Sequence, residues 1–331
     1  MFKPVLTSLS AFTLISCATM ASAPDPVSDG TLFVANKRGN SLSKLDLATG
    51  EEVLRVDACR NPHELAASTD GRHVALACYG GTSVDVFRTA DLQLVKSIDL
   101  GENARPHGIV WHSNGDLYAT AEGRRSIFWV RDPLGRAELF EYGTAKEGSH
   151  MLAVSPDARY AWTTDLGSKT VTRLDLITRR APLSREVGVE PEGIALSPDG
   201  QTLWVSARGS DKAFALDPQT LEVRREVATG NFPLRIAIRP QGDVAVTSDL
   251  ANGTLTVIDT ATGERLRTIP VSSRAEAEAR QQVTILWSPD GRRIYVAETG
   301  SDTVAEVDYA SGEVLRRLQV GAGGDGLAII R

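Results

Sequence analysis

Three of the five histidines in this 331-residue sequence stand at one repeated position. His63, His107 and His150 each lie two residues before a leucine or isoleucine, in the segments "PHEL", "PHGI" and "SHML". The intervals between them are 44 and 43 residues, and Glu192 follows after a further 42 residues in "PEGI". This spacing indicates that one structural position recurs in four successive repeats.

The residue types at this position are those that ligate metals. Asp325, in "GDGL", takes the same position near the end of the chain, whereas Leu234 and Val283 take it in the two intervening repeats. Neutral imidazoles and carboxylates bind divalent and transition metals, and an open coordination position allows exchange or catalysis. The sequence therefore predicts a metal ion (Zn, Cu, Fe or Mg) held by five residues: His63, His107, His150, Glu192 and Asp325. Two alternatives stay open, a metal-free acid–base cluster and histidines that only hydrogen-bond the backbone.

Tight turns with Asx/Gly chemistry recur at the same interval. They read "TDG" (69–71), "SNG" (113–115), "PDA" (156–158), "PDG" (198–200), "PQG" (240–242) and "PDG" (289–291). Each turn separates two short apolar segments, and two further strand-like segments follow. Four short strands per unit of about 42–44 residues is the period of a propeller blade rather than of a helical solenoid. No long stretch keeps a helical period, so the predicted class is all-β.

The ends of the chain predict the number of blades. The segment 325–331, "DGLAIIR", resembles an innermost strand with no successors, and the residues after 28 supply three strands with no predecessor. Joined, these segments make one blade and close the ring without a free edge. The predicted architecture is a seven-bladed β-propeller of four-stranded blades, forming a single domain over residues 24–331.

Several passages resemble the YVTN-type (YncE-like) propeller family. They are the "SPDG" turns, "IYVAETGSDTV", "LFVANKRGNSL" and the "DTATGE" hairpin. The resemblance spans residues 28–331 and implies the fold more strongly than an activity, since propellers serve many functions. The "PHG" segment is also similar to those of propeller lyases of the virginiamycin B type. That similarity implies a metal-dependent lyase or lactonase-like hydrolase with three catalytic residues: His107, His150 and Glu192. A non-catalytic protein-interaction scaffold is the other alternative.

Further residues are expected on the same face of the propeller. The ends of the second strands carry seven of them: Lys37, Tyr79, Glu122, Asp165, Arg208, Asp249 and Glu298. Arg235, beside Leu234, is predicted to meet a small anionic ligand, and three acids are predicted to complete the binding site: Glu122, Asp165 and Glu298. The alternative for each is an ordinary surface or structural ion pair.

The insert "SSRAEAEARQQ" (272–282) lengthens one repeat to 49 residues. Ser273 followed by alternating Ala, Glu and Arg predicts a short capped helix. On the predicted face it is either a lid over the mouth of the channel or a solvated bulge.

The first 23 residues are predicted to be a signal peptide. "LISC" (14–17) resembles a lipobox, with lipidation of Cys17, while "ASA" (21–23) resembles an ordinary cleavage site. The expected protein is exported, either anchored to the outer membrane or soluble in the periplasm, and it meets a membrane only through such an anchor. In that compartment Cys59 and Cys78 are predicted to form a disulfide, with free thiols or a thiolate ligand as alternatives. The net charge of −6 without a dense Lys/Arg run disfavours nucleic acid as a partner, leaving a metal ion, a small anionic molecule or a protein.

Overall fold

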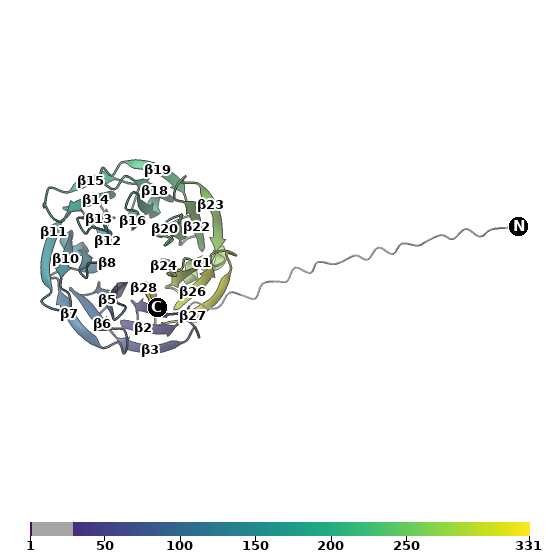
Figure 1. Cartoon of the computed structure of the whole chain (residues 1–331), viewed down its shortest axis with the longest axis horizontal. Helices are drawn as coiled ribbons and strands as arrows, with labels where there is room; N and C mark the ends of the chain where they lie inside the picture. Colours follow the sequence, from purple (N-terminus) through teal and green to yellow (C-terminus); the bar gives the residue numbers. More distant parts are fainter. Residues whose placement is uncertain (2–28) are drawn as a thin grey trace.

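The computed structural model describes Met1 and residues 29–331. The predicted signal peptide and the lipidation at Cys17 lie outside the described residues. Seven antiparallel sheets of four strands surround a common axis (Figure 1). The predicted seven-bladed all-β propeller is therefore confirmed. Among the described residues no helix is long and apolar enough to cross a membrane.

Each blade runs from an innermost strand at the axis to an outer edge strand. Blade 1 contains β28 (Gly324–Ile330), β1 (Thr31–Asn36), β2 (Ser41–Asp46) and β3 (Glu52–Asp57). Blade 2 contains β4 (Pro62–Ala67), β5 (His73–Cys78), β6 (Ser83–Arg88) and β7 (Leu94–Asp99). Blade 3 contains β8 (Pro106–Trp111), β9 (Leu117–Ala121), β10 (Ser126–Arg131) and β11 (Glu138–Gly143). Blade 4 contains β12 (Ser149–Val154), β13 (Tyr160–Asp165), β14 (Thr170–Asp175) and β15 (Leu183–Glu186).

The remaining three blades follow the same order. Blade 5 contains β16 (Pro191–Leu196), β17 (Leu203–Ala207), β18 (Lys212–Leu216) and β19 (Val223–Ala228). Blade 6 contains β20 (Pro233–Ile238), β21 (Val244–Asp249), β22 (Thr254–Asp259) and β23 (Arg265–Pro270). Blade 7 contains β24 (Gln282–Trp287), β25 (Arg293–Glu298), β26 (Thr303–Asp308) and β27 (Val314–Gln319). Two single-turn 3-10 helices, Glu122–Arg124 and Arg208–Ser210, and α1 (Arg274–Arg280) complete the described structure.

The C-terminal strand closes the ring. β28 pairs antiparallel with β1, with Thr31 opposite Ile330 and Val34 opposite Leu327. Figure 1 shows the C-terminus within the ring, beside β2 and β28. The predicted closure is confirmed, and it pairs the inner edge of β1, which would otherwise be free.

The core lies between neighbouring blades, where the faces of two sheets meet. Val246 and Val257 of blade 6, for example, pack in one cluster with Ile294 and Val296 of blade 7. The tight turns fix the register of the inner hairpins. In the last of them, the Ser288 hydroxyl donates to Asp290 at 2.5 Å and Gly291 adopts φ +70°, a conformation that favours glycine.

The long insert forms the predicted helix, α1. The Glu276 carboxylate accepts hydrogen bonds from the backbone N–H of Ser273 (3.2 Å) and from its hydroxyl (2.7 Å), which fixes the N-terminal end. A Cβ on Gly253 would lie 3.2 Å from Ala277, and Arg280 pairs with Glu298 at 3.4 Å. Figure 1 places α1 farther from the centre of the ring than β24. The helix therefore covers the junction of blades 6 and 7 and is not the lid over the channel mouth that was one of its two interpretations.

Candidate functional site

A β-bulge in each innermost strand turns two consecutive residues toward the axis. In blade 2, Pro62 lies opposite Cys78 and Leu65 opposite Leu76, so His63 and Glu64 together face a single residue of β5. The other six inner strands shift register at the same place. A bulge of this kind re-aims side chains and is common at functional sites. The first residues of the seven bulges are His63, His107, His150, Glu192, Leu234, Val283 and Asp325.

The three predicted histidines lie in one stack at the channel mouth. The ring centroids of His63 and His107 are 4.8 Å apart, and those of His107 and His150 are 3.8 Å apart. Tyr79 closes the free end of the stack, with its ring 4.5 Å from that of His63 and 5.4 Å from that of His107. The regular spacing in the sequence therefore corresponds to direct contact in space.

His150 lies between two carboxylates. Its Nδ1 contacts Oε1 of Glu122, and its Nε2 lies 3.4 Å from Oε1 of Glu192. Glu122 in turn accepts a hydrogen bond from the hydroxyl of Tyr79 at 2.8 Å. Burial alone would lower the pKa of His150, but the two carboxylates outweigh it and raise that pKa above its ordinary value.

His107 has the opposite environment. It is 3% exposed, and its Nδ1 is buried with no hydrogen-bond partner among the described residues. Burial, together with the neighbouring His150 and His63 and the cations Arg235 and Lys37, holds the pKa of His107 well below its ordinary value. Burial also lowers the pKa of His63, whose Nδ1 lies 3.1 Å from the carbonyl of Asn61. The stack thus joins two neutral imidazoles to one that favours its protonated form.

A buried ion network crosses the channel below the histidines. Arg235 pairs with Glu192 at 2.7 Å and with Glu64 at 2.8 Å, although 171 residues separate Arg235 from Glu64. Arg208 contacts the other oxygen of Glu192 at 2.6 Å. These cations, together with His150, outweigh burial and lower the pKa of Glu192 to about 2. Burial raises the pKa of Glu64 despite its contact with Arg235.

Asp325 joins the network from blade 1. Its carboxylate pairs with Lys37 at 3.0 Å and lies 3.5 Å from the hydroxyl of Thr284. Both predicted acids of the ring, Glu192 and Asp325, are therefore already neutralised by basic side chains. Arg235, which was predicted to meet an anionic ligand, is instead 6% exposed and held by two carboxylates. That prediction is not supported by the contacts it makes.

The seven residues predicted at the ends of the second strands occupy two different positions relative to those ends. Four of them directly follow the last residue of the strand: Lys37, Tyr79, Glu122 and Arg208. Each of these four contacts one of the histidines or carboxylates described above. Asp165, Asp249 and Glu298 are one residue earlier, as the last residues of β13, β21 and β25, and all three are fully buried. A shift of one residue in a strand turns a side chain to the other face.

The carboxylates of Asp165 and Glu298 form hydrogen bonds and an ion pair with residues of their own blades. Asp165 accepts from four hydroxyl groups, those of Ser149, Thr163, Thr170 and Thr172. Glu298 accepts from Thr303 at 2.6 Å and pairs with Arg317 at 3.0 Å. Their surroundings give Asp165 and Glu298 a structural role, and of the three predicted ligand-binding acids only Glu122 lies at the mouth.

Glu64 is a site residue that sequence reasoning missed. It is the second residue of its bulge, directly after His63 and equivalent to Arg235 in blade 6. The signal was available, because a glutamate between a histidine and a buried leucine interrupts the apolar pattern of an inner strand. The alternation of a regular strand would have turned Glu64 away from the axis.

The five predicted metal ligands do not surround one point. Among residues 29–331, three His, Cys, Asp or Glu ligand atoms lie within 4.8 Å of one another only at Cys59, Cys78 and Asp85. The two residues of the mouth that suit a metal ion are His63 and His107, because their imidazoles favour the neutral form and Nδ1 of His107 has no partner. Metal binding stays a prediction, and of its five predicted ligands His63 and His107 are the two that suit it best.

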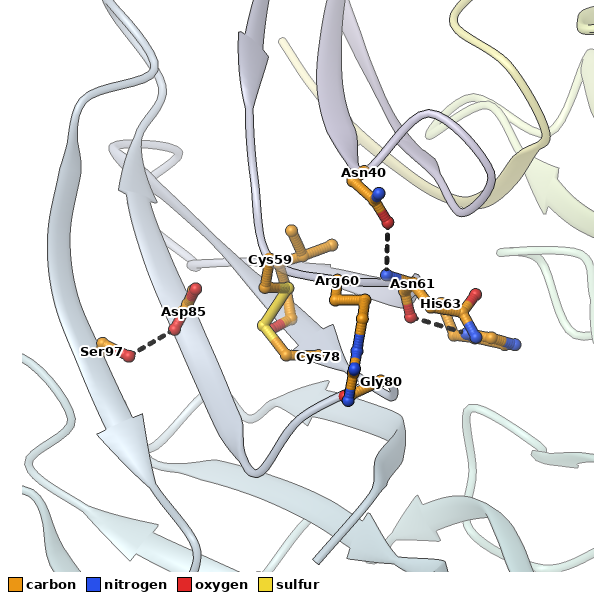
Figure 2. Close-up of a disulfide and its surroundings, with 10 residues drawn as sticks. Asn40, Cys59, Arg60, Asn61, His63, Cys78, Gly80, Asp85 and Ser97 are labelled. Atoms are coloured by element: carbon orange, nitrogen blue, oxygen red, sulfur yellow. Dashed lines mark hydrogen bonds between the residues drawn. A yellow bond between two sulfur atoms is a disulfide. The ribbon is translucent and has the colours of Figure 1, made fainter.

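A disulfide joins Cys59 and Cys78 beside the site, with their Cα atoms 5.7 Å apart. Figure 2 shows it between β5 and the segment that leads into β4, with Arg60, Asn61 and His63 following along that segment. Cys59 precedes Arg60 and Cys78 precedes Tyr79, so the bond ties together two walls of the mouth. A thiolate ligand is not available from this pair while it is oxidised.

Solved structures share this fold. A functionally unknown protein from Desulfotomaculum acetoxidans DSM 771 aligns with a TM-score of 0.77 and 14% identity, covering 92% of this chain and 99% of that one. A streptogramin B lyase aligns with a TM-score of 0.67 and 16% identity, covering 79% and 83%. The dihydro-heme d1 dehydrogenase NirN, in complex with DHE, aligns with a TM-score of 0.65 and 16% identity, covering 93% and 76%.

At these identities the likeness establishes the fold alone. No protein-family model matches the sequence, and no curated protein matches it either. The class that fold and site define is a seven-bladed propeller with a buried histidine–carboxylate cluster at its mouth.

Proposed function

We propose that this propeller is an acid–base enzyme of the lyase or hydrolase type, acting on a cyclic ester at the channel mouth. The observation that carries the proposal is the contact between His107 and His150, whose ring centroids are 3.8 Å apart with the ring planes tilted by 34°. Among the described residues, His150 is the member of this pair that contacts carboxylates, and Nδ1 of His107 has no hydrogen-bond partner. Nε2 of His150 faces Glu192 at 3.4 Å without a hydrogen bond. General acid–base catalysis uses one group that accepts a proton and another that donates one, and environments that push the pKa values of two neighbouring groups apart supply such a pair.

The roles follow from the two environments. In an elimination, His107 takes a proton from carbon, a carbon–carbon double bond forms, the carbon–oxygen bond breaks, and His150 gives its proton to the leaving oxygen. In a hydrolysis, His107 takes a proton from water, the water oxygen adds to the ester carbonyl carbon, the acyl carbon–oxygen bond breaks, and His150 gives its proton to the leaving alcohol oxygen. Glu192 is not the third catalytic group of this proposal, because Arg235 and Arg208 bind its oxygens. It positions His150 and stabilises its charge.

The likeness to a streptogramin B lyase supports the lyase type of this proposal. A virginiamycin B lyase from Staphylococcus aureus aligns with a TM-score of 0.66 at 12% identity. The glycine of the "PHG" segment has a separate structural reason here. A Cβ on Gly108 would lie 2.8 Å from the carbonyl oxygen of His150, so the close approach of blades 3 and 4 requires glycine at this position.

A panel of lactones and cyclic depsipeptides tests the proposal by mass spectrometry. Elimination opens the ring without changing its mass, whereas hydrolysis adds one water. We expect His107→Gln and His150→Gln each to lower kcat/KM at least about 100-fold, which is the usual contribution of a general acid or base. His112→Gln is the matched control. His112 is buried next to β8 of blade 3, the strand that carries His107, but its Nε2 bonds the carbonyl of Ser155 at 3.1 Å, so this variant should keep full activity. Equal activity in all variants, or no turnover of any cyclic ester, would contradict the proposal.

A second candidate function is metal binding by His63 and His107. It is favoured by the adjacency of two imidazoles with lowered pKa values and by the unpartnered Nδ1 of His107. A metal bound there would supply a Lewis acid for the ester carbonyl. We expect untagged protein to take up one Zn or Cu ion per chain in titration calorimetry, and the paired variant His63→Gln/His107→Gln to take up none. Uptake that persists in the paired variant would place the metal elsewhere.

We infer further that the chain is an exported member of the YVTN-type propellers. The Cys59–Cys78 disulfide supports an oxidising compartment. The intact mass of the mature protein decides between lipidation at Cys17 and cleavage after residue 23.

A further inference from the structure

A surface cavity opens beside the channel mouth, next to the disulfide. Its volume is about 460 Å³, and its walls include Arg60, Asn61, Tyr79, Asn103 and Arg105. A cavity of this size is within the range of small-molecule sites. It belongs to blades 2 and 3, and Figure 2 shows that Arg60 extends from the disulfide segment toward Gly80.

The two arginines of this cavity donate to neutral groups, and Arg105 is linked to the carboxylate of Glu122 through the hydroxyl of Tyr79. Arg60 donates to the carbonyl oxygen of Gly80 through Nε at 2.7 Å and also through Nη2. The guanidinium of Arg105 lies over the ring of Tyr79, 4.5 Å from its centroid, and donates to its hydroxyl. Within residues 29–331 neither arginine forms an ion pair with a carboxylate. Both are exposed, so their remaining N–H groups are free to meet a ligand.

Nearby arginines on this face are neutralised. Arg124 forms a two-bond pair with Glu141, at 2.9 and 2.7 Å, and Arg38 pairs with Asp302 at 2.7 Å. The chain as a whole is acidic, with a net charge of −6. Two unpaired arginines facing one cavity are therefore not the result of a general excess of basic residues.

We propose that this cavity, the Arg60–Arg105 pocket, binds an anionic group, a carboxylate or a phosphate. The planar guanidinium matches both anions with parallel hydrogen bonds. Arg235 cannot serve this purpose, because Glu64 and Glu192 already bind it. The proposed anion site is therefore the Arg60–Arg105 pocket and not Arg235.

Tyr79 connects the pocket to the histidine stack. Its ring lines the pocket and lies 5.4 Å from the ring of His107, while its hydroxyl donates to Glu122. A molecule anchored by its anionic group in the pocket would reach past Tyr79 toward His107. We infer that the substrate is an ester that carries a carboxylate or phosphate. This last step rests on the proposed function, whereas anion binding itself does not.

Direct binding measurements test the pocket with three aromatic probes. Phenyl phosphate, benzoate and neutral benzamide are titrated into the full chain and followed by NMR line broadening. We expect the two anions to bind at least tenfold more tightly than benzamide, with an affinity that falls as salt rises. The ratio of phenyl phosphate to benzoate affinity then distinguishes the two anion classes.

Substitutions distinguish anion binding in the Arg60–Arg105 pocket from catalysis at the histidines. Arg60→Gln/Arg105→Gln should weaken the binding of both anions at least tenfold. Arg124→Gln, which removes one positive charge from the same face, should leave their affinities unchanged and is the charge-matched control for Arg105→Gln alone. Because Arg60 also holds Gly80, Arg105→Gln alone serves as a second variant if the paired variant unfolds. Unchanged anion affinity in these variants, or equal affinity for benzamide, would overturn the proposal. His107→Gln should keep the anion affinity, so bound anions without ester turnover would refute only the proposed function.

Discussion

At the residue scale, two histidines in contact show how neighbours set the charge of a buried group. Desolvation lowers the pKa of both His107 and His150. For His150, contact with Glu122 and Glu192 reverses the direction. His107 has only the other imidazoles and distant cations around it, and these lower its pKa further. Opposite protonation states at one pH follow from which ring contacts the carboxylates.

A buried aspartate away from the mouth gives a stability prediction at the same scale. Burial raises the pKa of Asp249 to about 6, even though Thr247 and Thr256 each donate to it at 2.7 Å. The folded state therefore holds this proton more tightly than the unfolded chain. The resulting stability is full below the ordinary pKa of 3.8 and is lost as the pH rises through about 6.

We expect Asp249→Asn to remove this dependence. Between pH 4 and pH 8, the unfolding free energy of the wild type should fall by about 2.5 kcal/mol relative to the variant, because most of a shift of about two pKa units lies within this window. Urea unfolding at the two pH values measures the difference. Asp259→Asn is the control: hydrogen bonds from Thr262 lower the pKa of Asp259, so its titration lies below this window. Parallel pH profiles for the wild type and Asp249→Asn would contradict the assignment.

At the element scale, the inner-strand bulge explains what the sequence could and could not predict. The interval of 42 to 44 residues is kept from His63 to Leu234, so alignment of the inner strands predicts correctly that His63, His107 and His150 lie together. A bulge adds one residue to the inner strand, and it turns two side chains instead of one toward the axis. Glu64 was missed for that reason, because its place depends on the backbone rather than on residue type.

The prediction of binding residues on the second strands was partly wrong for a related reason. Residues near the ends of these strands were predicted to share one face, which placed Asp165 and Glu298 with Glu122 although they are one position apart in register. Period-two alternation makes such a slip decisive. The helix of the insert was predictable from local capping, but its position was not, since packing of Ala277 against Gly253 decides where it lies.

Hydroxyl groups of the second strands hold the bulges of neighbouring blades together. Thr120 accepts from the N–H of Gly108 at 2.8 Å and donates to the carbonyl of His150 at 2.7 Å. Thr164 makes the equivalent bond to the carbonyl of Glu192 at 2.7 Å. These bonds join blades 3, 4 and 5, so the positions of His150 and Glu192 depend on contacts between elements as well as within them.

At the scale of the whole molecule, the site depends on a closed ring. Arg235 of blade 6 reaches Glu64 of blade 2, and Asp325 of blade 1 reaches Lys37 of the same blade. Removing one partner of a buried ion pair leaves the other charge uncompensated, which is strongly destabilising. Opening the ring at blade 1 should therefore disturb both the core and the mouth.

Deleting residues 324–331 makes this test. The deletion removes β28 and uncovers Leu32 and Val34 of β1, which are fully buried in the intact protein. It also removes Leu327, itself 5% exposed. A loss of several kcal/mol from this exposed apolar surface should lower Tm by on the order of 10 °C.

Two controls make the result specific to strand pairing. Deleting only Arg331, which is exposed at the chain end, should leave Tm unchanged. Adding a peptide of residues 324–331 to the truncated protein should raise its Tm in a concentration-dependent way, because a ligand that binds only the folded state stabilises it. A truncated protein with the Tm of the full chain would mean that β28 contributes little to holding the ring closed, and that blade 1 is stable with three strands.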